Sequence, residues 1–219
     1  MNSINGITKY FIERGLKLIP EPTDPNFLCV DDGGVEVETG EFIYGLIRRI
    51  KPQQCFSTGV YTGISDLYTA KALQDNGFGH LTAIEYEQYH IDRAQELWNK
   101  MGVFQQITVI KSDSMLYKPD KQFQFMFLDT ELYLRFKELV KFYPNLDEGG
   151  YVFIHDMPNN LCKGNKNTDH PNYVNWPVGE FPREFDVLLK EDKLRMFHFP
   201  GARGMVGFYK PKKDDYKWG

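Results

Sequence analysis

Cysteine is scarce in this chain of 219 residues, which has only Cys29, Cys55 and Cys162. Three cysteines so far apart are too few for a zinc site, and an odd number argues against the disulfide framework of a small secreted protein. A chain of this length buries roughly 70% of its unfolded surface in one core, so its fold needs neither a disulfide nor a structural metal. We therefore expect a single domain over residues 1–219, located in the reducing cytoplasm.

Long apolar runs and excess positive charge are also missing. The segment before Pro20 places Ile4, Ile7, Phe11 and Ile12 at helical spacing among charged residues, which indicates an amphipathic helix rather than a signal sequence. The 26 Lys and Arg residues against 30 Asp and Glu residues give a net charge of −4. Because non-specific nucleic-acid binding needs clustered Lys and Arg, we expect neither a nucleic acid nor a membrane as partner.

Short apolar runs that alternate with helix-period segments fill the chain from Thr39 to Lys210. This alternation is typical of an α/β sheet. We expect helices over residues 41–50, 65–75, 88–101, 132–143 and 183–190, and strands over 54–57, 80–85, 107–110, 123–128, 151–154, 195–199 and 205–209. Thr39 is the expected cap of the first of these helices, and residues 147–150 are expected to form a turn.

The last two strands are joined by a short turn, so they are expected to be antiparallel. The predicted fold is therefore a Rossmann-like, mostly parallel sheet of seven strands with helices on both faces and an antiparallel C-terminal strand pair. After His155 the alternation stops until about residue 183. Connections of that length in a compact domain are usually functional.

Polar side chains follow the predicted parallel strands at the edge where their carboxyl ends meet, which is where open α/β sheets bind ligands. These residues are the turn of residues 57–65 with Gly59 and Gly63, then Glu85, Asp113, Asp129, His155 and Asp156. Acids at one edge repel each other unless a cation or hydrogen-bond donors lie between them. The pattern predicts a ligand that carries positive charge or donors.

Glycine spacing narrows the ligand class. Gly59 and Gly63 allow a tight turn and close approach of the backbone to a ligand, with the amide groups of the next helix directed at the same place. Their spacing is Gly-x-x-x-Gly, which is neither the dinucleotide fingerprint of redox enzymes nor a phosphate-binding Walker loop. Glu85, at the end of the second strand, suits the two hydroxyls of a ribose.

In this order and spacing the motifs resemble the class I S-adenosylmethionine (SAM)-dependent methyltransferases. Within that class the chain is similar to small-molecule O-methyltransferases of the catechol and caffeoyl-CoA type and to their sugar- and antibiotic-modifying relatives. The resemblance covers roughly residues 37–211. It rests on residues 59–65, 82–85, 127–129, 149–150 with His155 and Asp156, and 200–204.

This resemblance implies a SAM-dependent enzyme that methylates a hydroxyl of a small molecule. It implies a cofactor site made of Gly59, Tyr61, Gly63 and Ser65 at the methionine part, Glu85 at the ribose, Tyr86, Asp113 and Ser114 at the adenine, and Asp129 near the amino group. It also implies Asp129, His155 and Asp156 as catalytic residues, and Asp129, Asp156 and Asn159 as ligands of Mg²⁺ or another divalent cation.

The chain would then divide into an N-terminal helix and lid at 1–36, a cofactor-binding core at 37–156, a substrate loop at 157–182, and a closing helix and hairpin at 183–211. The N-terminal segment is long enough to pair between two copies, which leaves a homodimer open.

Departures from the family pattern keep several alternatives open. Ser57 stands where the family usually has Glu, Leu132 where it has a catalytic Lys, and Met157 where it has a metal-binding Asn. His155 is a candidate base, metal ligand or packed histidine, and Glu131 or Asn160 could replace Asn159 in an oxygen-rich metal site.

One rival function is a non-catalytic interaction module with this fold. The other is a methyltransferase acting on a macromolecule, although the Asn/Asp-Pro-Pro-Tyr/Phe motif of nucleic-acid amino methyltransferases is replaced by residues 129–132.

Overall fold

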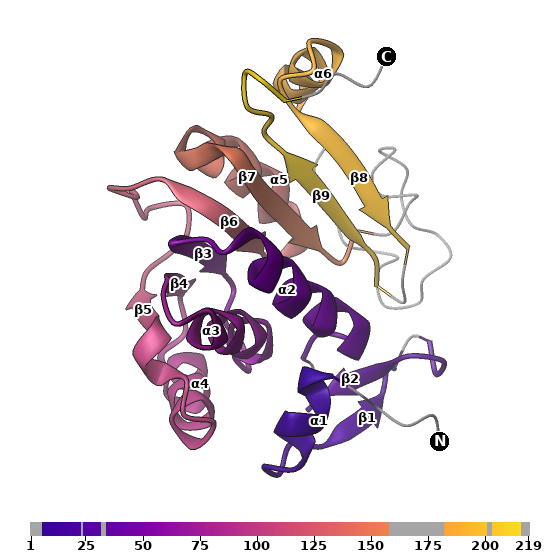
Figure 1. Cartoon of the computed structure of the whole chain (residues 1–219), viewed down its shortest axis with the longest axis vertical. Coiled ribbons are helices and arrows are strands. Elements are labelled where there is room, and N and C mark those ends of the chain that lie inside the picture. Colours follow the sequence, from indigo (N-terminus) through magenta and orange to yellow (C-terminus); the bar gives the residue numbers. More distant parts are fainter. Residues whose placement is uncertain (1–5, 23, 32–33, 158–181, 201–202, 216–219) are drawn as a thin grey trace. The chain divides into compact units, whose positions relative to one another are not determined.

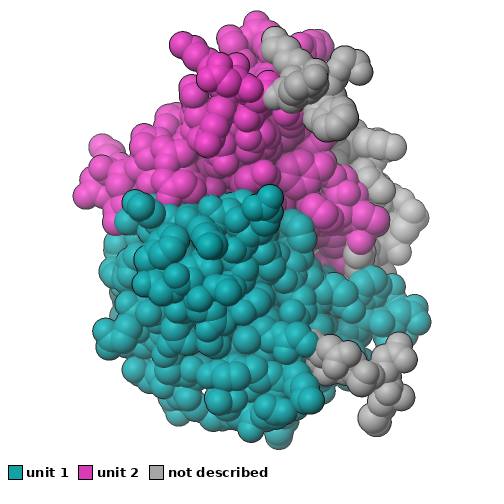
Figure 2. Space-filling view, in the orientation of Figure 1, with its two compact units in different colours: residues 1–117 teal, residues 118–219 magenta. Residues whose placement is uncertain are grey.

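The computed structural model describes residues 6–22, 24–31, 34–157, 182–200 and 203–215. The chain forms two compact units, which Figure 2 colours separately: unit 1 is Met1–Tyr117 and unit 2 is Lys118–Gly219. The segment boundaries expected from the sequence stay predictions, and of the expected substrate loop only Met157 and Pro182 are among the described residues. No helix within these described ranges is long and apolar enough to cross a membrane.

Unit 1 is built on three parallel strands that alternate with helices (Figure 1). Its main elements are α1 (Ile7–Ile12), β1 (Leu18–Pro20), β2 (Leu28–Val30), α2 (Val37–Ile50), β3 (Gln54–Thr58), α3 (Ile64–Asn76), β4 (His80–Glu85), α4 (Gln88–Lys100) and β5 (Ile107–Lys111). β4 pairs in parallel with both β3 and β5, so that Leu81 lies opposite Cys55 and Ile107. Buried side chains such as Phe56 and Leu81 fill the core, as expected for strands covered on both faces.

Unit 2 contains β6 (Phe123–Leu128), α5 (Leu132–Phe142), β7 (Leu146–His155), α6 (Arg183–Lys190), β8 (Arg195–Phe199) and β9 (Met205–Tyr209). β6 and β7 are parallel, whereas β9 is antiparallel to both β7 and β8. The strand order along the sheet is β5-β4-β3-β6-β7-β9-β8. The predicted mostly parallel, seven-stranded sheet with an antiparallel C-terminal pair is confirmed.

The predicted turn at residues 147–150 is wrong, because these residues lie inside β7. The Gly149 N–H donates to the Lys210 carbonyl at 2.6 Å, and the Lys210 N–H donates to the Gly150 carbonyl at 3.0 Å. Gly149 has a positive φ of 82°, and the pairing of β7 with β6 is irregular at the start of β6. The two glycines therefore mark an irregularity within a strand, where the hydrogen-bonded ladder continues.

At the N-terminus the expected helix is present as α1, six residues long, and the β1–β2 hairpin follows it without having been predicted. Figure 1 shows both beside α2. Glu41 of α2 accepts hydrogen bonds from the backbone N–H and the hydroxyl of Thr8, both at 2.6 Å. The Thr8 hydroxyl also lies 2.6 Å from the Tyr68 hydroxyl in α3. The Glu41 carboxylate therefore accepts an N–H that has no partner within the first turn of α1, and it ties this helix to α2.

The start of α2 differs from the expected one. The helix begins at Val37, and its N-cap residue is Glu36 in an extended conformation. Thr39, the expected cap, lies in the first turn, where its hydroxyl donates to Glu36 Oε2 at 3.0 Å. The predicted Thr39 cap is therefore wrong, because the helical turn already formed two residues earlier.

Gly40 lets α2 approach α3 closely, and its replacement should destabilise unit 1. A Cβ added at Gly40 would lie 2.3 Å from the Tyr68 ring, whereas a Cβ at Gly45 of the same helix meets nothing within 4 Å. We expect Gly40→Ala to lower the free energy of unfolding by about 1–3 kcal/mol through overpacking. Gly45→Ala is the matched control and should raise it by up to about 1 kcal/mol, since Ala is the better helix former. Urea unfolding of both variants measures the difference, and equal effects would contradict the close packing.

Candidate functional site

The turn between β3 and α3 in unit 1 has a backbone that requires glycine. Gly63 is the N-cap residue of α3 and has φ 78°. A Cβ there would lie 2.8 Å from both Ala94 Cβ and Trp98 Nε1 of α4. The Trp98 indole N–H donates to the Gly63 carbonyl at 2.8 Å. The turn is thus packed directly on α4, and any side chain at Gly63 would force it away.

Glu85, the last residue of β4, is hydrogen-bonded to this turn. Its Oε2 accepts the Tyr61 N–H at 3.1 Å, and its Oε1 accepts the N–H groups of Tyr86 and Glu87 at 2.7 and 2.8 Å. Tyr61 has φ 48°, a conformation that costs energy for a residue with a side chain. A carboxylate offers about four acceptor positions, so a fourth donor can still bind Glu85.

Two buried hydroxyls near the turn have no hydrogen-bond partner among the described residues. Ser57 Oγ is in β3 and Thr62 Oγ1 is in the turn itself, and these residues are only 4% and 2% exposed. Buried polar atoms are nearly always hydrogen-bonded in native proteins, so an unpartnered pair indicates a missing polar ligand. The hydroxyls, the turn and Glu85 suit a ligand with ribose hydroxyls and charged amino-acid groups, so the residues present fit SAM.

The other cofactor residues expected in unit 1 lie around this turn or beyond β5. Gly59 has φ 77° and donates its N–H to the Ile84 carbonyl at 3.0 Å, and Ser65 is buried in the first turn of α3. Tyr86 is exposed beside Glu85. The Ser112 N–H donates to the Glu85 carbonyl at 2.9 Å, which brings the following Asp113 and Ser114 near the end of β4. Asp113 Oδ1 accepts the Met115 N–H in its own turn at 2.7 Å, and Ser114 is buried.

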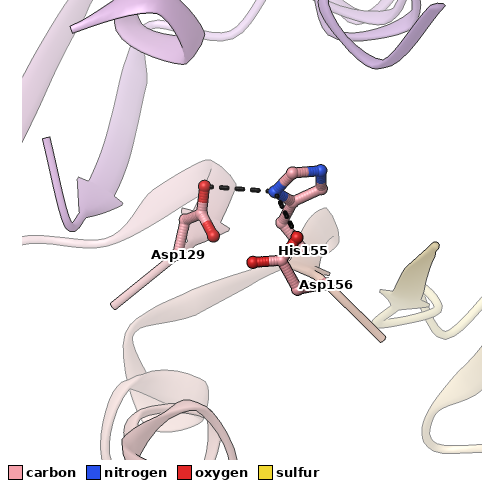
Figure 3. A group of neighbouring side chains, drawn as sticks. All are labelled: Asp129, His155 and Asp156. Atoms are coloured by element: carbon pink, nitrogen blue, oxygen red, sulfur yellow. Dashed lines mark hydrogen bonds and ion pairs between the residues drawn. The ribbon is translucent and has the colours of Figure 1, made fainter. Parts of the chain in front are cut away.

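In unit 2 the other expected residues meet at the ends of β6 and β7 (Figure 3). The strands pair Leu128 with Ile154, so Asp129 and His155 follow at neighbouring positions. His155 Nδ1 lies 3.2 Å from Asp129 Oδ2 and 3.4 Å from Asp156 Oδ1, while its other ring nitrogen points away from both carboxylates. The predicted catalytic trio is therefore assembled within one unit. The expected role of Asp129 toward the cofactor stays a prediction, and Asn159 lies outside the described residues.

Sequence reasoning missed Arg135 of α5, which holds this trio together. Its Nη2 lies 2.9 Å from Asp129 Oδ1 and 3.0 Å from Asp156 Oδ2. Its Nε donates to the Thr130 carbonyl at 2.7 Å, and its Nη1 donates to the His155 carbonyl. The signal was present, since Arg135 follows Leu132 by three residues and so lies on the apolar face of the helix.

A second arginine, Arg203, approaches the same cluster. It precedes β9, and its Nε lies 3.5 Å from Asp156 Oδ1. Its side chain is 16% exposed, whereas that of Arg135 is 5% exposed. The two carboxylates are therefore surrounded by two guanidinium groups and one imidazole, which gives a compact charge-paired cluster.

Comparison with known proteins points to one family. A family model described as O-methyltransferase matches residues 25–192. Tapetum-specific methyltransferase 1 of Arabidopsis thaliana is 30% identical over 122 residues, which make up 53% of this chain and 52% of that protein. A caffeoyl-CoA O-methyltransferase of Populus kitakamiensis is 31% identical over 124 residues, with coverages of 53% and 52%. The chain spans about half the length of the curated relatives it matches.

Solved structures agree on the fold. The O-methyltransferase TomG from Streptomyces achromogenes, involved in tomaymycin synthesis and solved in complex with SAM, superposes with a TM-score of 0.66. It is 18% identical to this chain, and the match covers 83% of both chains. Since the identity is low, this likeness concerns the arrangement of helices and strands.

Arg135→Gln should destabilise unit 2 strongly, because two buried carboxylates would lose their shared cation. Breaking a buried ion pair from one side typically costs about 3–5 kcal/mol of unfolding free energy. The matched control is Arg195→Gln, whose ion pair with Asp192 has side chains 28% and 36% exposed. Solvent-exposed pairs contribute little, so the control should unfold almost like the wild type. Thermal and urea unfolding measure both, and an equally mild effect of Arg135→Gln would contradict the buried pairing.

Proposed function

Because the chain belongs to the O-methyltransferase family, we propose that it transfers a methyl group from SAM to a hydroxyl of a small molecule. The observation that carries the proposal is Glu85 hydrogen-bonded to a glycine turn, with one unpartnered buried hydroxyl in that turn and another in the strand before it. The relatives, which include a caffeoyl-CoA O-methyltransferase, support a small hydroxylated acceptor.

The cofactor would bind unit 1. Glu85 accepts a hydrogen bond from a ribose hydroxyl, while the hydroxyls of Ser57 and Thr62 pair with the charged amino and carboxylate groups of the methionine part. The turn between Gly59 and Gly63 is fixed before binding by Trp98 and Glu85, so little ordering is required when the ligand arrives. SAM supplies the methyl group, and the chain supplies binding, orientation and exclusion of water.

The acceptor would bind at the cluster of unit 2. Asp129 is the member best placed to meet it, because its side chain is 17% exposed whereas that of His155 is 1% exposed. During the reaction the hydroxyl oxygen forms a bond to the methyl carbon, the carbon–sulfur bond breaks, and the hydroxyl proton passes to Asp129. His155 Nδ1 and Arg135 hold that carboxylate in position. Orientation of the two reactants can contribute several kcal/mol, on the order of 7–11 kcal/mol at best.

The remaining features of the proposal concern compartment and partners. A cytoplasmic location is supported by the small number of cysteines. Cys55 is buried, and burial raises the pKa of its thiol. The net charge of −4 supports a small molecule rather than a nucleic acid as acceptor. A homodimer stays a prediction.

Glu85→Gln should weaken SAM binding by about tenfold or more, since a hydrogen bond to a charged group contributes about 1.5–3 kcal/mol. Glu87→Gln is the matched control, because Glu87 is an exposed carboxylate two residues away. Isothermal titration calorimetry with SAM measures both dissociation constants. Absence of binding heat for the wild type at about 1 mM SAM, where even a weak site would fill, would refute the cofactor half of the proposal.

Asp129→Asn should lower kcat by about 100-fold or more, because the proton acceptor is lost. Asp120→Asn is the control, since Asp120 is exposed and precedes β6 whereas Asp129 follows it. The assay follows release of S-adenosylhomocysteine from a panel of hydroxylated metabolites, including catechols and sugar diols. SAM binding without turnover on any acceptor would instead favour the non-catalytic interaction module.

A further inference from the structure

The two aspartates of the unit 2 cluster already have a cationic partner, which is the guanidinium group of Arg135 in the same chain. Asp129 and Asp156 present one oxygen each to Nη2 of Arg135, at 2.9 and 3.0 Å. Both side chains are mostly buried, so their mutual repulsion is strong and a positive partner is required. The family resemblance implies a divalent cation at these two aspartates, whereas the structure has a guanidinium there.

A divalent cation does not fit this arrangement. Mg²⁺ binds carboxylate oxygens at about 2.0–2.1 Å and Ca²⁺ at about 2.3–2.6 Å, so either ion would have to occupy the position next to both carboxylates that Nη2 now takes. His155 Nδ1 already contacts the second oxygen of Asp129 and of Asp156. The ligand atoms of Asp129, His155 and Asp156 lie within 4.8 Å of one another, but one oxygen of each aspartate is already paired with Arg135.

Charge and ligand chemistry lead to the same result. Two carboxylates balance the guanidinium groups of Arg135 and Arg203, so a divalent ion would leave a net charge of about +2 in a largely buried place. Met157 stands where the family has a metal-binding Asn, and a thioether is a soft ligand that Mg²⁺ does not take. Its backbone carbonyl, the other possible ligand, is also engaged, since it lies 2.8 Å from His198 Nε2.

Arg135 is also fixed in a way that prevents it from simply moving aside. Its Nε and Nη1 donate to the carbonyls of Thr130 and His155, at the ends of the same two strands that carry the aspartates. The planar guanidinium therefore binds four acceptors with one rigid group, which a lysine could not do. The rest of the side chain lies on the buried face of α5.

We propose that Arg135 takes the place of the divalent cation, so that the acceptor site works without a metal. This inference rests on the proposed methyl transfer. In it Arg135 is a positioning residue that holds Asp129 toward the acceptor. Because no metal chelates the acceptor, a pair of adjacent hydroxyls is not required. The substrate class therefore includes molecules with a single hydroxyl, as well as catechols and diols.

Binding of Mn²⁺ tests the inference without SAM or an acceptor. Electron paramagnetic resonance measures free Mn²⁺ in solutions of the wild type, Arg135→Gln and the double variant Asp129→Asn with Arg135→Gln, each checked for folding by circular dichroism. We expect no binding to the wild type, one Mn²⁺ per chain for Arg135→Gln, and none for the double variant. Wild-type binding that Asp129→Asn abolishes would overturn the inference. Failure of a folded Arg135→Gln to bind would overturn the claim that Arg135 fills a cation position.

A second measurement does not need Arg135→Gln, so it holds even where that variant does not fold. The melting temperature should be the same in EDTA and in excess Mn²⁺, because a ligand that does not bind cannot stabilise the folded state. Release of S-adenosylhomocysteine should also be unchanged after chelation, and acceptors with one hydroxyl should turn over. A rise in melting temperature with Mn²⁺ that is absent in Asp129→Asn overturns the proposal. Loss of SAM binding, by contrast, contradicts only the methyltransferase function.

Discussion

Buried carboxylates at the ends of adjacent parallel strands need positive charge or hydrogen-bond donors beside them, and the candidate sites of both units depend on how that need is met. In unit 2 a full positive charge, Arg135, lies between Asp129 and Asp156. In unit 1 three backbone N–H groups surround Glu85. N–H dipoles stabilise an anion without cancelling its charge. Glu85 therefore keeps its attraction for a ligand's donors, whereas the charges of the two aspartates in unit 2 are balanced by arginine side chains.

The same contacts explain why the turn before α3 has a single shape. Tyr61 has a positive φ, which an L-residue adopts only when surrounding contacts hold it there. Its N–H is bound by Glu85, and two residues later the Gly63 carbonyl accepts hydrogen bonds from both Trp98 and Leu67. Removal of Glu85 would thus remove both a ligand contact and a support of the turn. A variant that keeps the size of the side chain and changes only its charge separates the two effects.

Much of the fold could be predicted from the sequence, because the spacing of apolar residues and the length of an apolar run are local properties of the chain. Strand β6 and helix α6 have the predicted bounds, as do β8 and β9. The failures have longer-range causes. The glycines of residues 147–150 suggested a turn, but pairing with Lys210, far along the chain, keeps them in β7. The β1–β2 hairpin has strands of only three residues each, too short for a periodic signal.

The candidate site was predictable in its acids but not in their partners. A carboxylate that follows an apolar run can be recognised from the sequence alone, so Glu85, Asp129 and Asp156 could be predicted as site residues. The partners that α5 supplies could not be predicted, because spacing places Arg135 on the apolar face of the helix but does not say which groups it meets. In the structure Arg135 and Glu138 of this helix are buried, whereas Val140 is exposed. Glu138 accepts a hydrogen bond from the Thr130 hydroxyl. A charge on the core side of a helix becomes interpretable only when the opposite charges it meets are known.

An arginine in place of a metal changes which group activates the acceptor. A divalent ion can bind a hydroxyl oxygen and stabilise its anion before methyl transfer. Arg135 has four of its contacts directed at Thr130, His155 and the two aspartates, and its side chain is almost wholly buried. It therefore stabilises the cluster and not the oxygen of the acceptor. A phenol with an ordinary pKa of about 10 stays protonated near neutral pH. Loss of its proton to Asp129 must then accompany formation of the new oxygen–carbon bond, which makes the alignment of that carboxylate the feature on which catalysis depends.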